Sequence, residues 1–297
     1  MKIDIYAGDC LDSLKKLEDQ SINTCITSPP YFALRDYGVE GQLGLEETPK
    51  EFIDNLVNVF KEVKRVLRDD GTVWLNIGDS YGNEKHLLGI PWRVAFAMQD
   101  DDWILRQDII WNKPNPMPES VKDRCTKAHE YIFLFSKSKK YYFDNEVIKE
   151  ESVTVNSKGE IGKPNSAKNV GKSVEGIDGF DVRSGFKDMG AYEKKNKRSV
   201  WTVATKPFTE AHFATFPKEL ILPCVLAGCP EGGTVLDPFA GSGTTGIVAN
   251  HKNRNAILLE LNEDYINIAV KRIRKEVGTL FLNLNIIRRK DESIKSV

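Results

Sequence analysis

The stretch Asp237-Pro238-Phe239-Ala240-Gly241-Ser242-Gly243-Thr244-Thr245-Gly246 follows the apolar residues 234–236 and precedes a segment of helical character. We expect a strand, a glycine turn and a helix start, where backbone N–H groups face a ligand. No lysine follows the glycines, as a phosphate loop would require. Glu260 lies 23 positions after Asp237, at the end of the next predicted strand. A carboxylate there can accept both hydroxyls of a ribose, so this pattern predicts a site for an adenosine-bearing ligand.

A second stretch, Thr27-Ser28-Pro29-Pro30-Tyr31, ends the apolar run 22–26. Two consecutive prolines remove two backbone donors and hold the chain extended. The stretch therefore predicts a stiff lip at the carboxyl end of a strand, where open α/β sheets bind their ligands. Taken alone, it is equally typical of an ordinary proline-rich turn.

Apolar runs and helical periods alternate along most of the chain. Residues 49–68 carry apolar side chains at helical spacing behind the start signal Thr48-Pro49. We expect strands at 3–6, 22–26, 72–77, 103–111, 131–135, 234–236 and 255–259, most of them continuous apolar runs, and a final strand or extended segment at 280–287. This alternation predicts an α/β protein with a mostly parallel sheet covered by helices on both faces.

The composition is that of an ordinary globular protein, with 297 residues, 40% hydrophobic and 29% charged. No apolar run approaches the roughly 20 residues that span a bilayer. Five scattered cysteines without a C-x-x-C pair argue against disulfides and a metal site, and favour a cytoplasmic protein. Because the net charge is −1, any nucleic-acid surface has to be a local basic face.

Residues 145–198 interrupt the alternation with Gly, Ser, Lys and Asn and little periodicity. A structureless loop of this length inside a compact domain is uncommon, so we interpret it as an inserted recognition segment. A solvated loop is the alternative. The expected division is a catalytic part, 1–144, the insert, 145–198, and a cofactor-binding part, 199–297. The basic residues expected to contact phosphates in or next to the insert are Lys187, Lys194, Lys195, Lys197 and Arg198.

The order of these stretches resembles the β class of DNA amino-methyltransferases. In that family an S-P-P-Y or D-P-P-Y motif comes first, a target-recognition region follows, and an F-x-G-x-G motif that binds S-adenosylmethionine comes last. The resemblance implies a Rossmann-like methyltransferase fold with a mostly parallel, seven-stranded sheet. It also implies S-adenosylmethionine as cofactor and double-stranded DNA as substrate. A cognate restriction endonuclease and a monomeric or homodimeric state are open expectations.

The resemblance further implies roles for individual residues. Asp9, in Gly8-Asp9-Cys10, would hold the adenine amino group, although a helix cap explains it equally well. Glu260 would hold the ribose, and Asp237 with the glycine turn would hold the methionine end. The full set of expected cofactor residues is Asp9, Cys10, Thr27, Phe213, Phe216, Lys218, Asp237, Phe239, Gly241, Ser242, Gly243, Thr244, Glu260 and Leu261. For Phe216 and Lys218, a role in the helix core is the alternative.

The catalytic residues that the resemblance implies are Ser28, Pro29, Pro30 and Tyr31. The lone pair of an exocyclic amine is conjugated into its ring, so acceptors on its N–H groups are needed to favour attack on the sulfonium methyl, with nitrogen, methyl and sulfur in line. The target base would be flipped out of the duplex. Asn112 and Lys113 are expected to help hold that base or a phosphate. The pair His129-Glu130 is interpreted as structural, and Cys224 as a core residue.

The prediction of the target base, cytosine or adenine, depends on Ser28. In the resembling family, S-P-P-Y accompanies mostly N4 of cytosine and D-P-P-Y mostly N6 of adenine. We therefore expect a cytosine-N4 enzyme, with adenine N6 as the alternative. More remote alternatives are a methyltransferase for small molecules or proteins, and a nucleic-acid-binding module without catalysis.

Overall fold

The computed structural model describes residues 1–151, 154–155, 161–162, 194–206, 216–278 and 283–288. The chain divides into two compact units, one of 1–144 with 198–297 and the other of 145–197. In the smaller unit, β6 (Glu150–Glu151) pairs antiparallel with β9 (Lys194–Lys195), and β7 (Thr154–Val155) with β8 (Ile161–Gly162). A 3-10 turn, Glu146–Ile148, precedes β6.

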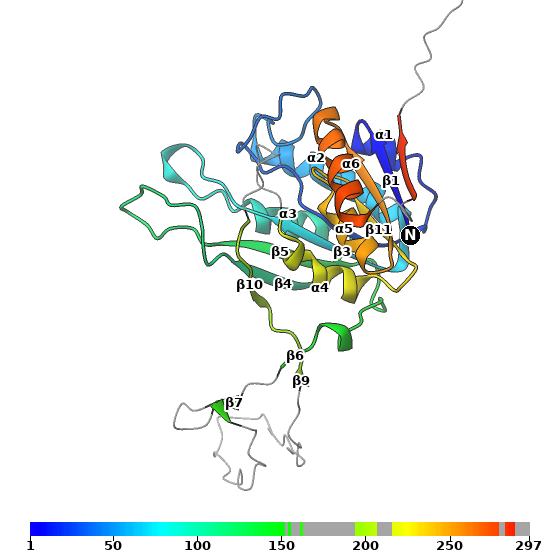
Figure 1. Cartoon of the computed structure of the whole chain (residues 1–297). Helices are drawn as coiled ribbons and strands as arrows, with labels where there is room; N and C mark the ends of the chain where they lie inside the picture. The colour runs from blue at the N-terminus through cyan, green and yellow to red at the C-terminus, as the bar shows by residue number, and fades with distance from the viewer. Residues whose placement is uncertain (152–153, 156–160, 163–193, 207–215, 279–282, 289–297) are drawn as a thin grey trace, which may run out of the picture. The chain divides into compact units, whose positions relative to one another are not determined.

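The larger unit is built on a sheet of nine strands in the order β10-β4-β5-β3-β2-β11-β12-β1-β13 (Figure 1). Strand β5 is antiparallel to both neighbours, and the other pairs are parallel. The strands are β1 (Lys2–Ala7), β2 (Ile22–Thr27), β3 (Leu67–Ile77), β4 (Ile104–Asn112), β5 (His129–Ser136), β10 (Val200–Thr202), β11 (Thr234–Asp237), β12 (Asn255–Glu260) and β13 (Asn283–Ile287).

The predicted α/β class with a mostly parallel sheet is confirmed, but the predicted number of seven strands is wrong. Strands β10 and β13 lie at the two edges of the sheet, and β13 falls within the segment 280–287 that was expected to be a final strand or extended. They have only three and five residues and stay partly exposed. Each therefore lacks the continuous apolar run that marks a buried parallel strand.

Helices cover both faces of this sheet. Val73 and Leu75 of β3 share a core with α2 and α3, whereas Gly228 of α4 lies against Trp74 and Thr72 on the opposite face. The helices are α1 (Cys10–Leu14), α2 (Pro49–Val66), α3 (Ile90–Asp100), α4 (Lys218–Gly228), α5 (Thr244–His251) and α6 (Glu263–Val277), with a 3-10 turn at Asn83–Lys85. No helix in the described ranges is long and apolar enough to cross a membrane.

Helix α2 shows how local sequence signals determine where a helix begins and which face is buried. The Thr48 side chain accepts from Glu51 N and the Glu51 side chain accepts from Thr48 N, which together form a capping box. Pro49 occupies the first turn, where its missing N–H costs nothing. The apolar side chains then repeat along one face and are buried, so the predicted helix at 49–68 agrees with the structure to within two residues.

The two motifs meet at the centre of the sheet although they lie about 210 residues apart. Strand β2, which leads into Ser28, pairs in parallel with β11, which leads into the glycine turn. The Thr27 hydroxyl donates to Asp237 Oδ1 at 2.7 Å, which joins the two strand ends. Strand β12 lies on the far side of β11, so Glu260 reaches the same edge of the sheet.

Candidate active site

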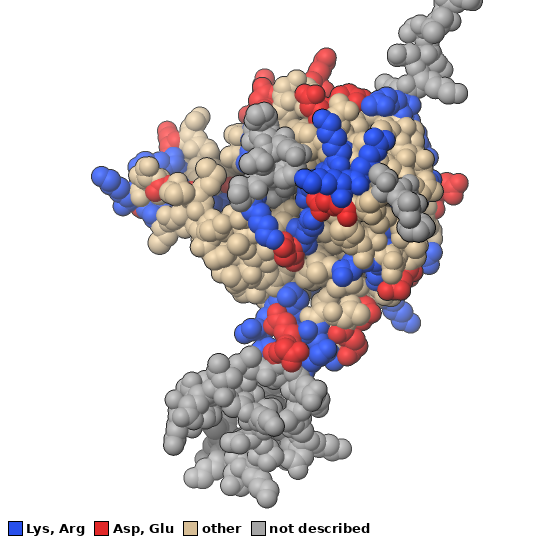
Figure 2. Space-filling view, viewed as in Figure 1, with Lys and Arg blue, Asp and Glu red and all other residues tan. Residues whose placement is uncertain are grey.

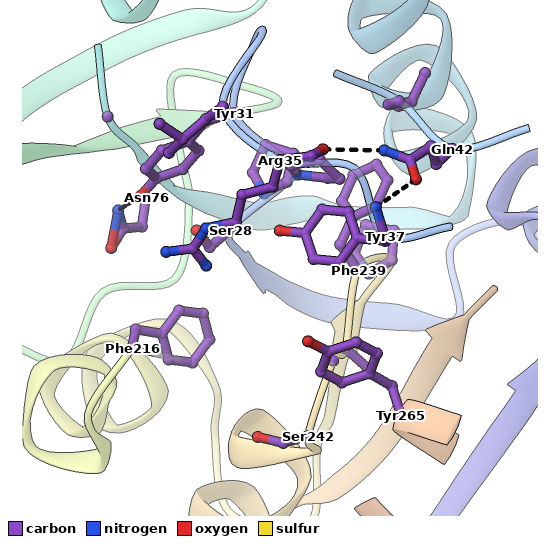
Figure 3. A pocket seen from close by; sticks show the side chains of 18 of the residues that line it. Ser28, Tyr31, Arg35, Tyr37, Gln42, Asn76, Phe216, Phe239, Ser242 and Tyr265 are labelled. Atoms are coloured by element: carbon purple, nitrogen blue, oxygen red, sulfur yellow. Dashed lines mark hydrogen bonds between the residues drawn. The ribbon is translucent and has the colours of Figure 1, made fainter. Parts of the chain in front are cut away.

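A cavity of about 920 Å³ opens at the carboxyl ends of these strands. We call Ser28–Tyr31 with Asn76, Lys113 and Glu130 its lip side, and Pro238–Thr244 with Asp9 and Glu260 its turn side. Figure 3 shows Ser28, Arg35 and Tyr37 on one side of the space and Phe216, Ser242 and Tyr265 on the other. The predicted site residues that line the cavity are Asp9, Cys10, Ser28, Pro29, Pro30, Tyr31, Lys113, Phe216, Phe239, Gly241, Ser242, Thr244, Glu260 and Leu261.

Asp237 fixes the glycine turn from behind. Its side chain is completely buried and accepts from the hydroxyls of Thr27 and Thr245, at 2.7 and 2.6 Å, and from Phe239 N at 3.1 Å. Burial raises the pKa of this carboxyl to about 6, against the lowering effect of the three hydrogen bonds. Asp237 is not among the lining residues, so it shapes the turn rather than the cavity wall.

Two glycines give the turn its path. Gly241 and Gly243 both have positive φ, of 50° and 76°, which costs little without a Cβ. A Cβ on Gly243 would also lie 3.1 Å from the Cβ of Ala269 in α6. The turn thus presents its backbone to the cavity and delivers the chain into α5.

Glu260 bridges the turn and the following loop. Its Oε2 accepts from Gly241 N at 2.7 Å, and its Oε1 accepts from Asn262 N at 2.9 Å. Burial raises the pKa of the Glu260 carboxyl, and the two backbone hydrogen bonds oppose that rise. Each oxygen retains a further lone pair for a ligand hydroxyl.

Asp9 caps a helix and also lies in the cavity wall. Its Oδ1 accepts from Asp12 N at 3.0 Å and caps α1, and the residue also lines the cavity. The neighbouring Cys10 is partly buried against the same wall, and burial raises the pKa of its thiol to about 12. Cys10 is therefore a neutral contact surface and not a nucleophile.

Aromatic residues from a loop and a helix complete the turn side. The rings of Tyr37 and Tyr265 meet edge to face with centroids 6.2 Å apart. The Gln42 side chain accepts from Tyr37 N and donates to the Arg35 carbonyl, which holds this loop in shape (Figure 3). Burial raises the pKa of Tyr265 to about 12. The sequence analysis missed these residues. Tyr37 lies in the glycine-rich loop directly after the proline lip, and Tyr265 lies in α6.

On the lip side, the Tyr31 hydroxyl donates to Glu130 Oε2 at 2.6 Å and accepts from Asn76 Nδ2 at 3.0 Å. The Lys113 ammonium is paired with Glu130 Oε1, so four side chains form one network. Burial and the Glu130 charge raise the pKa of Tyr31 well above its ordinary value, and the phenol stays neutral. A Cβ on Gly78 would lie 2.5 Å from the Tyr31 ring, so only glycine lets the ring pack there.

Known proteins resemble this chain along most of its length. Residues 22–271 match the N6/N4 methyltransferase family, described as DNA methylase. The chain is 43% identical to the Type II methyltransferase M.Cfr9I of Citrobacter freundii, over 96% of this chain and 90% of that protein. It is 42% identical to M.SmaI of Serratia marcescens, over 91% and 90%. The chain belongs to the N6/N4 DNA methylase family.

Solved structures share the fold of this methylase. The PvuII DNA methyltransferase, described as cytosine-N4-specific, aligns with a TM-score of 0.67 at 20% identity, over 96% of this chain and 95% of that one. A Thermus thermophilus protein assigned as a DNA modification methylase was solved with S-adenosyl-L-methionine. It aligns with a TM-score of 0.62 at 24% identity, over 95% and 98%. The predicted family and Rossmann-like fold are therefore confirmed.

Several residues predicted to contact the cofactor in this methylase lie elsewhere. Lys218 is paired with Glu276 of α6 and does not line the cavity, because the first turn of α4 directs it to the helix layer. Thr27, Asp237 and Gly243 support the turn from behind. Phe213 lies outside the described residues.

The residues predicted to contact DNA differ in the neighbours that they contact in the structure. The Asn112 side chain donates to Thr202 Oγ1 at 3.1 Å, and Asn112 does not line the cavity. Lys194 and Lys195 lie opposite Glu151 and Glu150 in the β6–β9 pair. Lys197 pairs with Glu150 at 3.3 Å, Arg198 begins the return to the larger unit, and Lys187 is outside the described part of the chain.

Glu130 and Arg272 are the polar residues whose importance the sequence analysis missed. Glu130, which the sequence favoured as structural, lines the cavity and binds Tyr31. Arg272 of α6 donates to the hydroxyls of Ser242 and Thr244, at 2.8 and 2.7 Å, and so holds the outer part of the turn. Its only sequence signal was the i,i+4 pair with Glu276.

Proposed function

We propose that this methylase transfers a methyl group from S-adenosyl-L-methionine to the N4 amine of a cytosine flipped out of double-stranded DNA. The observation that carries the proposal is that the proline lip and the glycine turn face one cavity. The Thr27–Asp237 hydrogen bond and the pairing of β2 with β11 fix their separation. A donor on the turn side and an acceptor base on the lip side would therefore share one space.

The turn side suits the donor. Glu260 has lone pairs available for the two ribose hydroxyls, and Asp9 has its Oδ2 available for the adenine amino group. The glycine turn lets a charged methionine end approach the backbone. A volume of about 920 Å³ lies within the range of ligand pockets, roughly 300–1,000 Å³, and leaves space for a base beside the donor.

The lip side suits an amine. The Ser28 hydroxyl and the Pro29 carbonyl both lie at the cavity wall, and both can accept from an N–H group. Acceptance from the amine shifts its nitrogen toward a tetrahedral geometry and frees the lone pair for attack. The sulfonium methyl would then pass to nitrogen as the carbon–sulfur bond breaks with its electron pair on sulfur, and the methylated nitrogen would release one proton to solvent. Positioning the reactants in line supplies much of the rate.

The network around Tyr31 would keep its ring still. Because Glu130 and Asn76 hold the hydroxyl, and Gly78 allows close packing, the ring has one defined plane. A fixed aromatic plane stacks on a flipped base at a small entropic cost. This supports a role for Tyr31 in holding the base rather than in acid–base chemistry.

Ser28 supports cytosine over adenine. A serine in this position accompanies mostly cytosine N4 in the family, and the PvuII enzyme of the same fold is described as cytosine-N4-specific. Contact with the duplex would come from Lys194, Lys195, Lys197 and Arg198, with Lys187 as a further candidate. Because Lys113 forms an ion pair with Glu130, we assign Lys113 to the base pocket rather than to a phosphate contact.

The test is to express the chain in cells and sequence their DNA for modified positions. Digestion of that DNA and mass spectrometry of its nucleosides then identifies the product. We expect N4-methylcytosine in one sequence context in cells with the parent, and none in cells with Ser28→Ala. N6-methyladenine alone would overturn the cytosine assignment. Methylation of a small molecule or protein, but not of DNA, would overturn the proposal.

A further inference from the structure

Two loops form a projection beside the lip side of the cavity, and we define the projection as residues 79–89 and 113–128. They extend side by side away from the sheet (Figure 1, left). Lys85 pairs with Asp123 at 2.5 Å, and Arg124 stacks over the Tyr81 ring at 4.2 Å. The Lys127 ammonium donates to the Asp79 carbonyl at 2.6 Å. These contacts bind the two loops into one body.

Met117 is the most exposed large apolar residue of the described chain, at 84%. It also lines the cavity, together with its neighbours Asn115, Pro116 and Glu119. Exposure of single apolar residues on a surface is normal. A methionine that is 84% exposed and also lines the cavity proposed to receive a base is a different case, because a base leaving a duplex creates an apolar gap beside it.

The backbone that carries Met117 is held on both sides. Asn115 exchanges hydrogen bonds with Thr205, through its side chain to the Thr205 carbonyl at 3.0 Å and from Thr205 N at 2.9 Å. Glu119 accepts from Arg124 at 2.6 Å and from Lys127 N at 3.2 Å. Pro116 and Pro118 flank the methionine and restrict the backbone further. The side chain is therefore presented from a stiff support.

Charged side chains of this projection form ion pairs with one another. Basic and acidic side chains both lie on the projection (Figure 2, left), and the pairs Lys85–Asp123 and Arg124–Glu119 join them. The projection is therefore not a basic arm that binds phosphates by charge alone. What it offers next to the cavity is an apolar side chain on a rigid base.

We propose that Met117 is a wedge that enters the base stack and occupies the place left by the flipped target base. Apolar side chains, methionine among them, are inserted between base steps by proteins that unstack DNA. The flexible thioether of methionine adapts to an irregular gap. The role is one of positioning, because Met117 would stabilise the open duplex and take no part in methyl transfer. The inference rests on the proposed function.

The test compares two substrates that differ in the cost of flipping. One duplex carries the recognition sequence found by sequencing, and the other carries the same sequence with the target cytosine opposite a base that cannot pair with it. An unpaired base costs less to extrude. We expect Met117→Ala to lower kcat/KM about tenfold on the paired duplex, and less than about twofold on the mismatched one, relative to the parent.

Two variants control the experiment. Met117→Leu keeps an apolar side chain of similar length and is expected to retain the parent's rates on both duplexes. Leu45→Ala removes another half-exposed apolar side chain, at 50%, that lies outside both the projection and the cavity wall, and is expected to change neither rate. Because Met117 is exposed, its truncation should leave the melting temperature unchanged.

A fluorescent cytosine analogue at the target position gives a second readout. Its emission should rise on binding of the parent, and less on binding of Met117→Ala. An equal loss of rate on both duplexes, or no loss on the paired one, would overturn the wedge while methylation by the parent upholds the proposed function. A parent that methylates neither duplex would overturn both.

Discussion

On the turn side of the cavity, every carboxylate oxygen of Asp237 and Glu260 accepts a hydrogen bond from a neighbouring hydroxyl or backbone N–H. On the lip side, Asn76 Oδ1 is buried without a hydrogen-bond partner among the described residues. Buried polar groups without partners cost free energy. The contrast indicates that the carboxylates that shape the turn are already held by hydrogen bonds, whereas the lip side retains a buried acceptor without one.

The substitution Ser28→Ala should give the largest difference between an effect on methyl transfer, assigned to the lip side, and an effect on cofactor binding, assigned to the turn side. Loss of the hydroxyl should lower the single-turnover methylation rate by about 100- to 1,000-fold, the range for removing one preorganised hydrogen-bonding group that acts on a transition state. The affinity for S-adenosyl-L-methionine, measured by calorimetry, should change less than twofold. The matched control is Ser21→Ala, at the opposite end of β2, where the hydroxyl donates to the Glu18 carbonyl. A parent-like rate for Ser28→Ala would contradict the assignment of the lip.

Asp237→Asn tests whether the turn side is held by a buried carboxylate. Burial raises the pKa of Asp237 from 3.8 to about 6. The protonated carboxyl therefore stabilises the folded state fully below pH 4, and this stabilisation is lost as the pH rises through 6. At about 1.4 kcal/mol per pKa unit, the loss is about 3 kcal/mol. Asparagine avoids this cost: its Oδ1 can accept from Thr27 Oγ1 and Phe239 N, and its Nδ2 would donate to the Thr245 hydroxyl instead of accepting from it. Urea unfolding of both proteins from pH 4 to 7 should show the variant gaining stability relative to the parent.

An unchanged difference in the free energy of unfolding between the two proteins across that range would show that Asp237 ionises normally. The same proteins would then also show no difference in the pH dependence of cofactor affinity. Either result would contradict a raised pKa for the buried Asp237 carboxyl.

Glu260→Gln tests the turn side as a binding surface. The amide retains one acceptor oxygen, so it can no longer accept from Gly241 N, Asn262 N and a ribose together. We expect Kd for S-adenosyl-L-methionine to rise about tenfold, because hydrogen bonds to charged groups contribute about 1.5–3 kcal/mol. The control is Glu263→Gln, an exposed carboxylate paired with Arg288 at 2.9 Å. Equal effects of the two variants in calorimetry would remove Glu260 from the binding site.

Lys218→Met should give the smallest effect. Its ammonium is paired with Glu276 and its side chain is 39% exposed, so the pair should contribute about 0–1 kcal/mol to stability. The affinity for S-adenosyl-L-methionine should stay within twofold of the parent's. A larger loss of affinity in the same titration would restore the role that the sequence alone assigned to Lys218.

Sequence analysis succeeded where the signal is local. The glycine spacing of 241–246 and the prolines of 29–30 fix the backbone through their own chemistry, and Thr48-Pro49 starts α2 in the same way. Glu260 was found because it ends the strand that directly follows the turn.

The missed residues depend on pairing between distant segments. Glu130 reaches Tyr31 only because β5 runs antiparallel beside β3, and a chain read in one direction does not show that reversal. For Lys218 the sequence left the cofactor site and the helix core both open, because one turn of helix decides whether a side chain enters the cavity or the layer behind it. Met117 carried no periodic signal, since its importance comes from exposure at the end of a rigid loop.

The strand order also has a consequence for how the protein is made. Strand β1 lies between β12 and β13, which follow it in the chain by about 250 residues or more and are therefore synthesised later. Such distant contacts form slowly because a long loop must close first. The centre of the sheet likewise waits for β11 to join β2. Synthesis of the last third of the chain is therefore the step that creates the active site, and a ribosome-bound fragment ending before β11 would hold the proline lip without its other wall.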